Sequence, residues 1–142
     1  MDKILNDLKI IAWFFIFPIF VLVAHLFLLF FNFYEAFPWG DIPVHFIGGV
    51  SVACTYFLIL KYLQKQSYLR MNSLVRVIFV FALVSLTAVF WEFFEFLAEY
   101  FTGLNLQGSL SDTMLDLFLG VFGGIITAIF LEKSVLKNIS KT

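Results

Sequence analysis

The chain has 142 residues and a formal net charge of −1, and 62% of its residues are hydrophobic while only 13% are charged. Its 21 phenylalanines and mean hydropathy of +0.99 lie far outside the range of soluble globular domains. The composition therefore indicates a membrane protein, and the lack of a soluble basic domain argues against nucleic-acid binding. The single cysteine, Cys54, excludes an internal disulfide.

Four apolar blocks are long enough to cross a hydrocarbon core of ~30 Å, which needs about 20 helical residues. They cover residues 10–33, 43–63, 74–96 and 113–131. We therefore expect an all-α, polytopic membrane protein in which residues 1–142 form a single domain of four transmembrane helices. The first block is too long for a signal peptide and has no cleavage site, so it is expected to be retained. Pro18 is expected to kink it.

The basic residues predict the orientation. All nine Lys and Arg residues lie before the first helix, in or beside the second connection, or after the fourth helix, while connections 32–42 and 102–112 contain none. By the positive-inside rule, both termini and the second connection are expected in the cytoplasm.

One ionisable residue in each helix is expected at the same depth. Each lies 16 or 17 residues from a basic residue at the inner end of its own helix, which is ~24–26 Å at a rise of ~1.5 Å per residue. These residues are His25, His45, Glu92 and Asp116. Because ionisable groups inside a membrane are costly, such a layer is a functional candidate.

Further acids extend this layer outward on the same helix faces. Asp41, Glu95, Glu99 and Asp112 lie three, four or seven residues from His45, Glu92 or Asp116, spacings that keep side chains on one face. Small residues, Gly49, Gly120 and Gly124, continue the faces inward, as is typical of closely packed membrane helices. The charged faces are therefore expected to point into the bundle.

These carboxylates would repel one another unless some are protonated or a cation neutralises them, because no Lys or Arg lies on their side. Oxygen ligands with imidazole suit a divalent Zn, Mn, Fe, Mg or Ca ion. The candidate metal ligands are His45, Glu92, Asp116, Asp41 and His25. Glu95 or Asp112 is the candidate general base for a metal-bound water.

Structural alternatives stand beside these assignments. Asp41 and Asp112 fit helix capping, His25 fits an interhelical hydrogen bond, and Glu92 with Glu95 fits an exposed interfacial turn. The segment 101–112 is either a lid over the acidic site or an ordinary connector. Aromatic residues are expected to anchor the helices at the two interfaces; they are Tyr34, Trp39, Trp91 and Tyr100 outside, and Trp13 and Tyr62 inside.

Three motifs carry a family resemblance: DIPVHFIGG opening the second helix, WEFFE closing the third, and SDTMLDLFLGVFGG opening the fourth. Together they resemble the YjdF-like family of uncharacterised bacterial membrane proteins and, more distantly, VanZ-like proteins. The resemblance covers residues 41–130 and leaves the first helix outside. It implies a location in the bacterial cytoplasmic membrane.

The VanZ-like pattern carries over to individual positions. Its Asp and His match Asp41 and His45, its Glu-x-x-Gln matches Glu92 and Glu95, and its Asp-x-x-x-Asn matches Asp112 and Asp116. Where that pattern has Gln and Asn, this chain has Glu95 and Asp116, which makes the expected site more acidic and a better ligand set for a hard cation.

We therefore expect a metal-dependent intramembrane hydrolase or transferase that acts on a lipid-linked or cell-envelope substrate near the extracytoplasmic face, with membrane lipids as partners. The familiar zinc-protease, serine-hydrolase and P-loop motifs are absent from the sequence. The alternatives are a proton- or cation-linked transporter, a lipid-binding module, and a structural membrane subunit. Homo-oligomerisation is left open.

Overall fold

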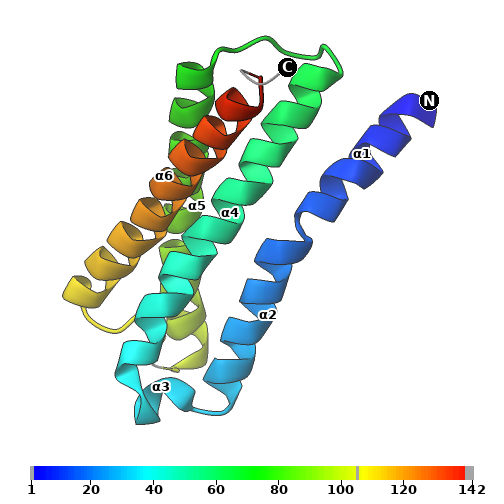
Figure 1. Ribbon diagram of the computed structural model, residues 1–142. Coiled ribbons are helices and arrows are strands. Elements are labelled where there is room, and N and C mark those ends of the chain that lie inside the picture. Colours follow the sequence, from blue (N-terminus) through cyan, green and yellow to red (C-terminus); the bar gives the residue numbers. More distant parts are fainter. Residues whose placement is uncertain (1, 105, 140–142) are drawn as a thin grey trace.

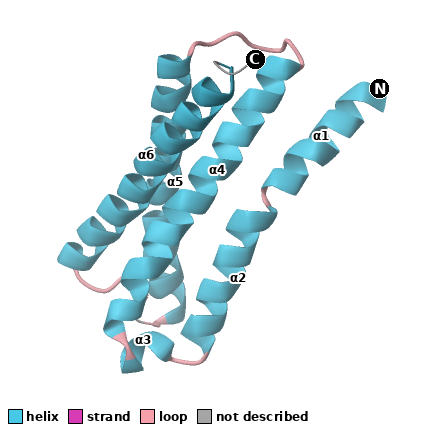
Figure 2. Cartoon of the chain, viewed as in Figure 1, coloured by secondary structure: helices cyan, strands magenta, loops and turns pink. Residues whose placement is uncertain are grey.

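The computed structural model describes residues 2–104 and 106–139, so Lys141, one of the basic residues used for orientation, lies outside it. Every element in this part of the chain is a helix (Figure 2). In chain order they are α1 (Asp2–Phe14), α2 (Ile16–Phe30), α3 (Phe33–Ala36), the short 3-10 helix η1 (Pro38–Gly40), α4 (Asp41–Lys65), α5 (Ser73–Thr102) and α6 (Leu110–Ile139).

The expected all-α membrane fold is confirmed. Helices α4, α5 and α6 are each long and apolar enough to cross a membrane, and α1 with α2 forms a fourth candidate span that is bent by 41°. The helices run beyond the expected blocks at nearly every end, since the hydrophobic blocks omit the polar turns that continue each helix. In Figure 1, α4, α5 and α6 form the compact part of the bundle, and α2 packs along α4.

The bend between α1 and α2 has a local cause. Pro18 lies in the first turn of α2 and has no N–H to donate to the carbonyl of Phe14. The hydroxyl of Thr55 on α4 donates to that carbonyl oxygen instead, at 2.8 Å. The polar group freed by the proline is thus satisfied by the neighbouring helix, as membrane helices require.

Glycines set the close approach of α4 and α6. A Cβ added at Gly49 would overlap the backbone carbonyl of Gly120, and one added at Gly123 would meet the carbonyl oxygen of Phe46. A Cβ at Gly124 would meet Val84 of α5. The expected packing at Gly49, Gly120 and Gly124 is therefore present.

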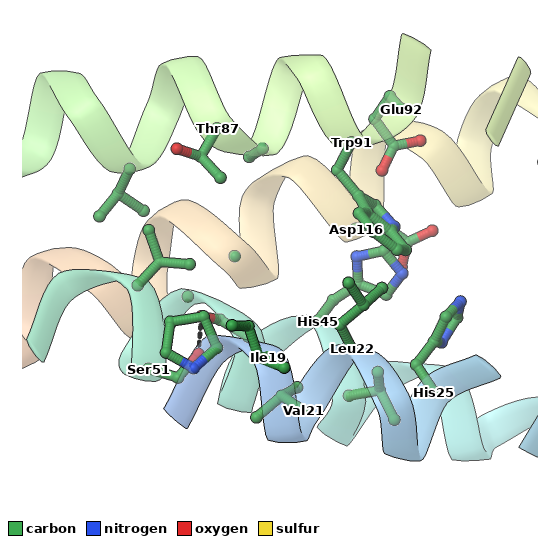
Figure 3. Close-up of a pocket in the computed structure, with 18 residues that line it drawn as sticks. Ile19, Val21, Leu22, His25, His45, Ser51, Thr87, Trp91, Glu92 and Asp116 are labelled. Carbon is green, nitrogen blue, oxygen red and sulfur yellow. Dashed lines mark hydrogen bonds and ion pairs between the residues drawn. The ribbon is translucent and has the colours of Figure 1, made fainter. Parts of the chain in front are cut away.

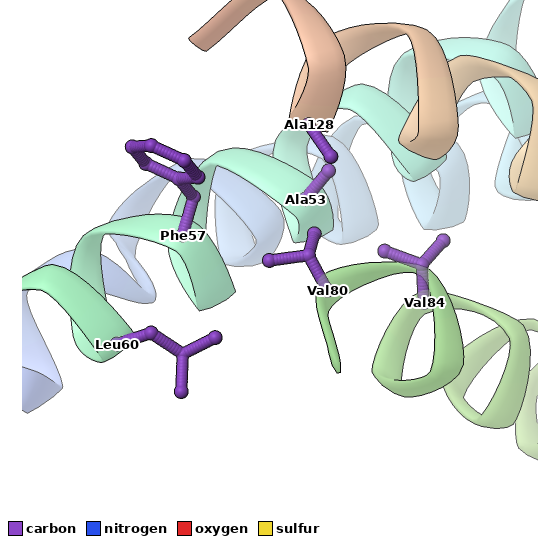
Figure 4. Packing of buried hydrophobic residues seen from close by; sticks show 6 residues of the cluster. All are labelled: Ala53, Phe57, Leu60, Val80, Val84 and Ala128. Atoms are coloured by element: carbon purple, nitrogen blue, oxygen red, sulfur yellow. The ribbon is translucent and has the colours of Figure 1, made fainter. Parts of the chain in front are cut away.

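We call the end of the bundle that carries the connection between α4 and α5 the inner end, and the opposite end the outer end. The apolar core lies toward the inner end and consists of Ala53, Phe57, Leu60, Val80, Val84 and Ala128, whose packing is shown in Figure 4. Beside it, Arg76 of α5 forms a buried, two-pronged ion pair with Glu132 of α6, with Nε–Oε2 at 2.7 Å and Nη2–Oε1 at 2.9 Å. Arg76 also donates to Gln64 of α4. This pair ties three helices together at the inner end.

Helix α1 is fastened to the same end by a second polar contact. The hydroxyls of Tyr62 and Tyr68 donate to the two carboxylate oxygens of buried Asp7, at 2.5 and 2.6 Å. The hydrogen bond to Asp7 raises the pKa of Tyr68. Tyr62, expected as an interface anchor, therefore joins α4 to α1.

The connection between α5 and α6 is fastened by Glu99. Its carboxylate accepts the backbone N–H groups of Leu106 and Gln107, at 2.8 and 2.9 Å, while Gly103 ends α5 in the left-handed conformation. Residue 105, within this expected lid or connector, lies outside the described residues. A carboxylate at the end of α5 thus shapes the connection instead of pointing into the bundle.

Candidate functional site

The outer ends of α2, α4, α5 and α6 bring the ionisable layer together around His45. Its Nε2 lies 3.3 Å from a carboxylate oxygen of Asp41, one turn earlier on α4, and 3.8 Å from a carboxylate oxygen of Asp116 on α6. From α5, Glu92 and Glu95 approach the same imidazole. Asp116, Glu92 and Glu95 are all buried.

Two sets of side chains are close enough to hold a metal ion. The first is Asp41, His45 and Asp116, and the second is His45, Glu92 and Glu95. Within each set, one ligand atom per residue lies within 4.8 Å of the others. Since His45 belongs to both sets, it is the natural centre of any metal site at this position.

His25 is placed by α3 as well as α2. Its Nδ1 lies 2.9 Å from the hydroxyl of Tyr34, and its Nε2 faces Glu95 at 3.6 Å. Burial raises the pKa of Tyr34, and the carboxylates of Asp41 and Glu95 raise it further. A phenol that keeps its proton can donate to Nδ1, and in that arrangement Nε2 carries the hydrogen and points toward Glu95.

Two buried atoms of the layer have no hydrogen-bond partner within the described structure: His25 Nε2 and Glu92 Oε2. Both residues are more than nine-tenths buried. Leaving a buried carboxylate oxygen unpaired is costly. A bound cation at this position would satisfy Glu92.

A cavity of about 270 Å³ lies on the inner side of this layer (Figure 3). The side chains of His25, His45, Glu92 and Asp116 line one end, so the residues expected at one depth meet at one cavity. Mostly apolar residues of α2, α4 and α5 line the rest, and α6 adds Gly120. Figure 3 shows Asp116 and Glu92 near His45, with Ser51 and Thr87 toward the opposite end.

Asp41 and Asp112 do not have the helix-capping role that the sequence allows. Gly40 is the N-cap of α4, with no side-chain cap, so Asp41 faces His45 instead of capping. At the start of α6 the hydroxyl of Ser109 accepts the N–H of Asp112, at 3.3 Å. Asp112 itself is exposed and belongs to neither of the two candidate ligand sets.

Two aromatic residues that are expected as interface anchors contact His25 in the structure. Trp91 lines the cavity and contacts His25, with ring centroids 5.3 Å apart, and Tyr34 contacts His25 through its hydroxyl. The sequence pattern does not predict these contacts, because Tyr34 lies in the outer connection and hydropathy gives no rotation for Trp91. The only feature of the sequence that indicates a place for Trp91 near the site is its position directly before Glu92.

A model of a family described as predicted membrane protein (DUF2238), the YjdF-like family, matches residues 4–136. The match includes the first helical segments, so the family likeness extends beyond the motifs in residues 41–130. Nothing in the comparisons supports the more distant VanZ-like resemblance. A search of curated proteins and a search of solved structures found no match.

Proposed function

The chain belongs to this family of predicted membrane proteins, and from that premise we propose that it is a metal-dependent enzyme acting on a lipid-linked or cell-envelope substrate. The observation that carries the proposal is the pair of ligand sets that share His45. Because an imidazole is present, Zn²⁺, Mn²⁺ or Fe²⁺ fits better than Mg²⁺ or Ca²⁺.

The ligands in this proposal are His45 and the carboxylates of Asp116 and Glu92. Asp41, which belongs to the first set, is a further ligand. Glu95 is the better candidate base than Asp112, since it is buried beside the site while Asp112 is exposed. His25 Nε2 faces a carboxylate oxygen of this base at 3.6 Å. A metal ion in such a site supplies a nucleophilic water or polarises an ester or phosphoryl oxygen.

In this proposal the site faces the outer half of a bacterial cytoplasmic membrane, with both termini in the cytoplasm. The basic residues at the inner helix ends support that orientation. Membrane lipids are the partners, and the enzyme would hydrolyse or transfer a group at the membrane surface.

Turnover tests the enzymatic assignment. Purified protein loaded with Mn²⁺ or Zn²⁺ would be reconstituted into vesicles of bacterial lipid extract, and lipid species followed by mass spectrometry. We expect a conversion that EDTA abolishes and that falls about 10²-fold or more in Glu95→Gln, the usual effect of losing a general base. Glu35→Gln, at an exposed acid of α3, is the matched control and should retain activity.

The same carboxylates also support a proton- or cation-linked transporter, since without an ion they would have to share protons. A pH-sensitive dye inside the vesicles distinguishes the two functions. Proton flux without lipid conversion would contradict the enzyme and favour transport, whereas EDTA-sensitive conversion without flux would support the enzyme.

A further inference from the structure

We propose that the cavity on the inner side of the acidic layer binds the aliphatic chain of a lipid. The lipid head group then lies at His45 and the carboxylates around it. The inference rests on the proposed function, because it names the class of substrate that the site receives. Four features of the cavity carry it.

The first feature is the wall of the cavity. Beyond the ionisable end, it is lined by Ile19 and Leu22 of α2, Val44 and Val52 of α4, and Val84 of α5, among others. All of these lie in segments long and apolar enough to cross a membrane. A cavity at this depth with such a wall suits a hydrocarbon chain better than water or a polar solute.

The second feature is that the hydroxyls at the far end are already satisfied. Ser51 donates to the carbonyl of Gly48 at 2.8 Å, and Thr87 is hydrogen-bonded to Tyr56 at 2.8 Å and to the carbonyl of Leu83 at 2.9 Å. These groups need no further partner from an occupant. The inner end of the cavity therefore behaves as an apolar surface.

The third feature is the exposure of that part of the cavity wall that α2 contributes. Helix α2 packs on α4, and the close contacts in the described structure do not include a comparable packing of α2 on α5. Ile19 lines the cavity and is 53% exposed, and Leu22 lines it and is 36% exposed. Exposed apolar residues at the rim of a membrane-embedded cavity would face lipid chains, which gives a chain a path from the bilayer.

The fourth feature is the polar end. The stretch from Val84 to Glu92 is eight residues of helix, about 12 Å at 1.5 Å per residue. A chain lying along it would bring its head to the unpartnered Glu92 Oε2 and His25 Nε2. Because carboxylates dominate there, an anionic head group is expected to bind only with a metal ion present, whereas a zwitterionic one does not need the ion.

Gly48 offers a direct test, since a Cβ added there meets nothing within 4 Å and would project into open space along the cavity. The full chain in vesicles would be photolabelled with a lysophosphatidylcholine that carries a diazirine at the end of its chain, and the labelled residues mapped by mass spectrometry. We expect labelling at Ile19, Val52 and Val84, falling about tenfold in Gly48→Leu as the side chain fills the space. Gly48→Ala should give a smaller decrease.

Ala82→Leu is the matched control, because Ala82 is exposed on α5 and does not line the cavity; its labelling should equal that of the wild type. The inference would be overturned if labelling were spread over outward residues such as Phe79 and Phe90 and did not change in Gly48→Leu. If Gly48→Leu does not fold, unchanged cavity labelling in Gly48→Ala would overturn it equally.

Metal content separates this inference from the proposed function. Gly48→Leu should keep its metal and lose the chain, while Asp116→Asn should lose the metal and keep labelling by the zwitterionic probe. Cavity labelling in a wild-type protein that binds no metal would support chain binding and contradict the metal-dependent enzyme. Bound metal with no cavity labelling would overturn chain binding alone.

Discussion

The imidazole of His25 is held on both sides of its ring by groups from other elements. Tyr34 of α3 contacts Nδ1, Glu95 of α5 faces Nε2, and Trp91 packs edge-on against the ring. These contacts join α2 to α5 at the outer end, just where the cavity stops. His25 thus lies at the ionisable end of the cavity, between the hydroxyl of Tyr34 and the carboxylate of Glu95.

Removing the hydroxyl of Tyr34 should weaken the packing around His25. Tyr34→Phe leaves Nδ1 of a buried histidine without its partner, and we expect a loss of about 1 kcal/mol in the free energy of unfolding. Denaturation in detergent, followed by tryptophan fluorescence, measures it. Tyr100→Phe is the control, because Tyr100 is 74% exposed; equal effects of both substitutions would contradict the role of Tyr34.

The buried ion pair of Arg76 and Glu132 makes a second prediction at this scale. Glu132→Gln leaves a buried guanidinium without its counter-charge, which typically costs ~3–5 kcal/mol. Lys133→Gln, at the exposed neighbouring position, should change the free energy of unfolding by less than about 0.5 kcal/mol. Equal stability of the two variants would show that the pair does not hold the inner ends together.

At the scale of the helices, adjacent glycines of α4 have different roles. Gly49 contacts the backbone of Gly120, so its missing Cβ permits the close approach of α4 and α6, whereas Gly48 faces the cavity. The bend at Pro18 belongs to the same scale, since Thr55 compensates for it from α4. Helix packing and cavity shape are therefore set by small residues one position apart.

The two glycines can be compared directly. Gly49→Ala forces a methyl group against the rigid backbone carbonyl of Gly120. We therefore expect the free energy of unfolding to fall by about 1–3 kcal/mol. Gly48→Ala adds a methyl in open space and improves helix propensity, so it should be neutral or stabilising by up to about 1 kcal/mol. Thermal unfolding of the two variants in one detergent checks the difference, and a reversed order would contradict the packing of α4 on α6.

Hydropathy and spacing predict much of this arrangement. Long apolar blocks identify the spans, and regular spacing of glycine with ionisable residues identifies the faces that meet, because both signals are local in sequence. The pairing of Arg76 with Glu132, of Asp7 with Tyr62 and of His25 with Tyr34 is not predicted. These partners come from different elements, and their meeting depends on helix rotation and on the bend of the first span, which no local pattern specifies.

Across the whole molecule, charge is separated along the bundle axis. The first residues of α1, the connection between α4 and α5, and the end of α6 lie at one end in Figure 1, and α3 and the connection between α5 and α6 lie at the other. The basic residues of the described chain gather at the first end and the acidic site lies toward the second. This separation is what the proposed orientation rests on.

Cysteine labelling tests that orientation. In a Cys54→Ala background, an impermeant maleimide added outside intact cells should label Leu104→Cys, an exposed position after α5, and should not label Ser67→Cys, an exposed position after α4. Labelling of both after permeabilisation is the control for reactivity. The opposite pattern would place the acidic site on the cytoplasmic side and contradict the proposed orientation.

The central claim is that the layer around His45 binds a metal ion, and metal content tests it most directly. Detergent-purified protein would be incubated with Zn²⁺, Mn²⁺ or Fe²⁺ and freed of unbound ion. Inductively coupled plasma mass spectrometry would then measure the bound metal per chain in the wild type, in His45→Ala, in Asp116→Asn and in the control Glu35→Gln. We expect about one ion per chain in the wild type and the control, and a loss in His45→Ala and Asp116→Asn. Absence of metal from the wild type, or its full retention in His45→Ala, would contradict the claim.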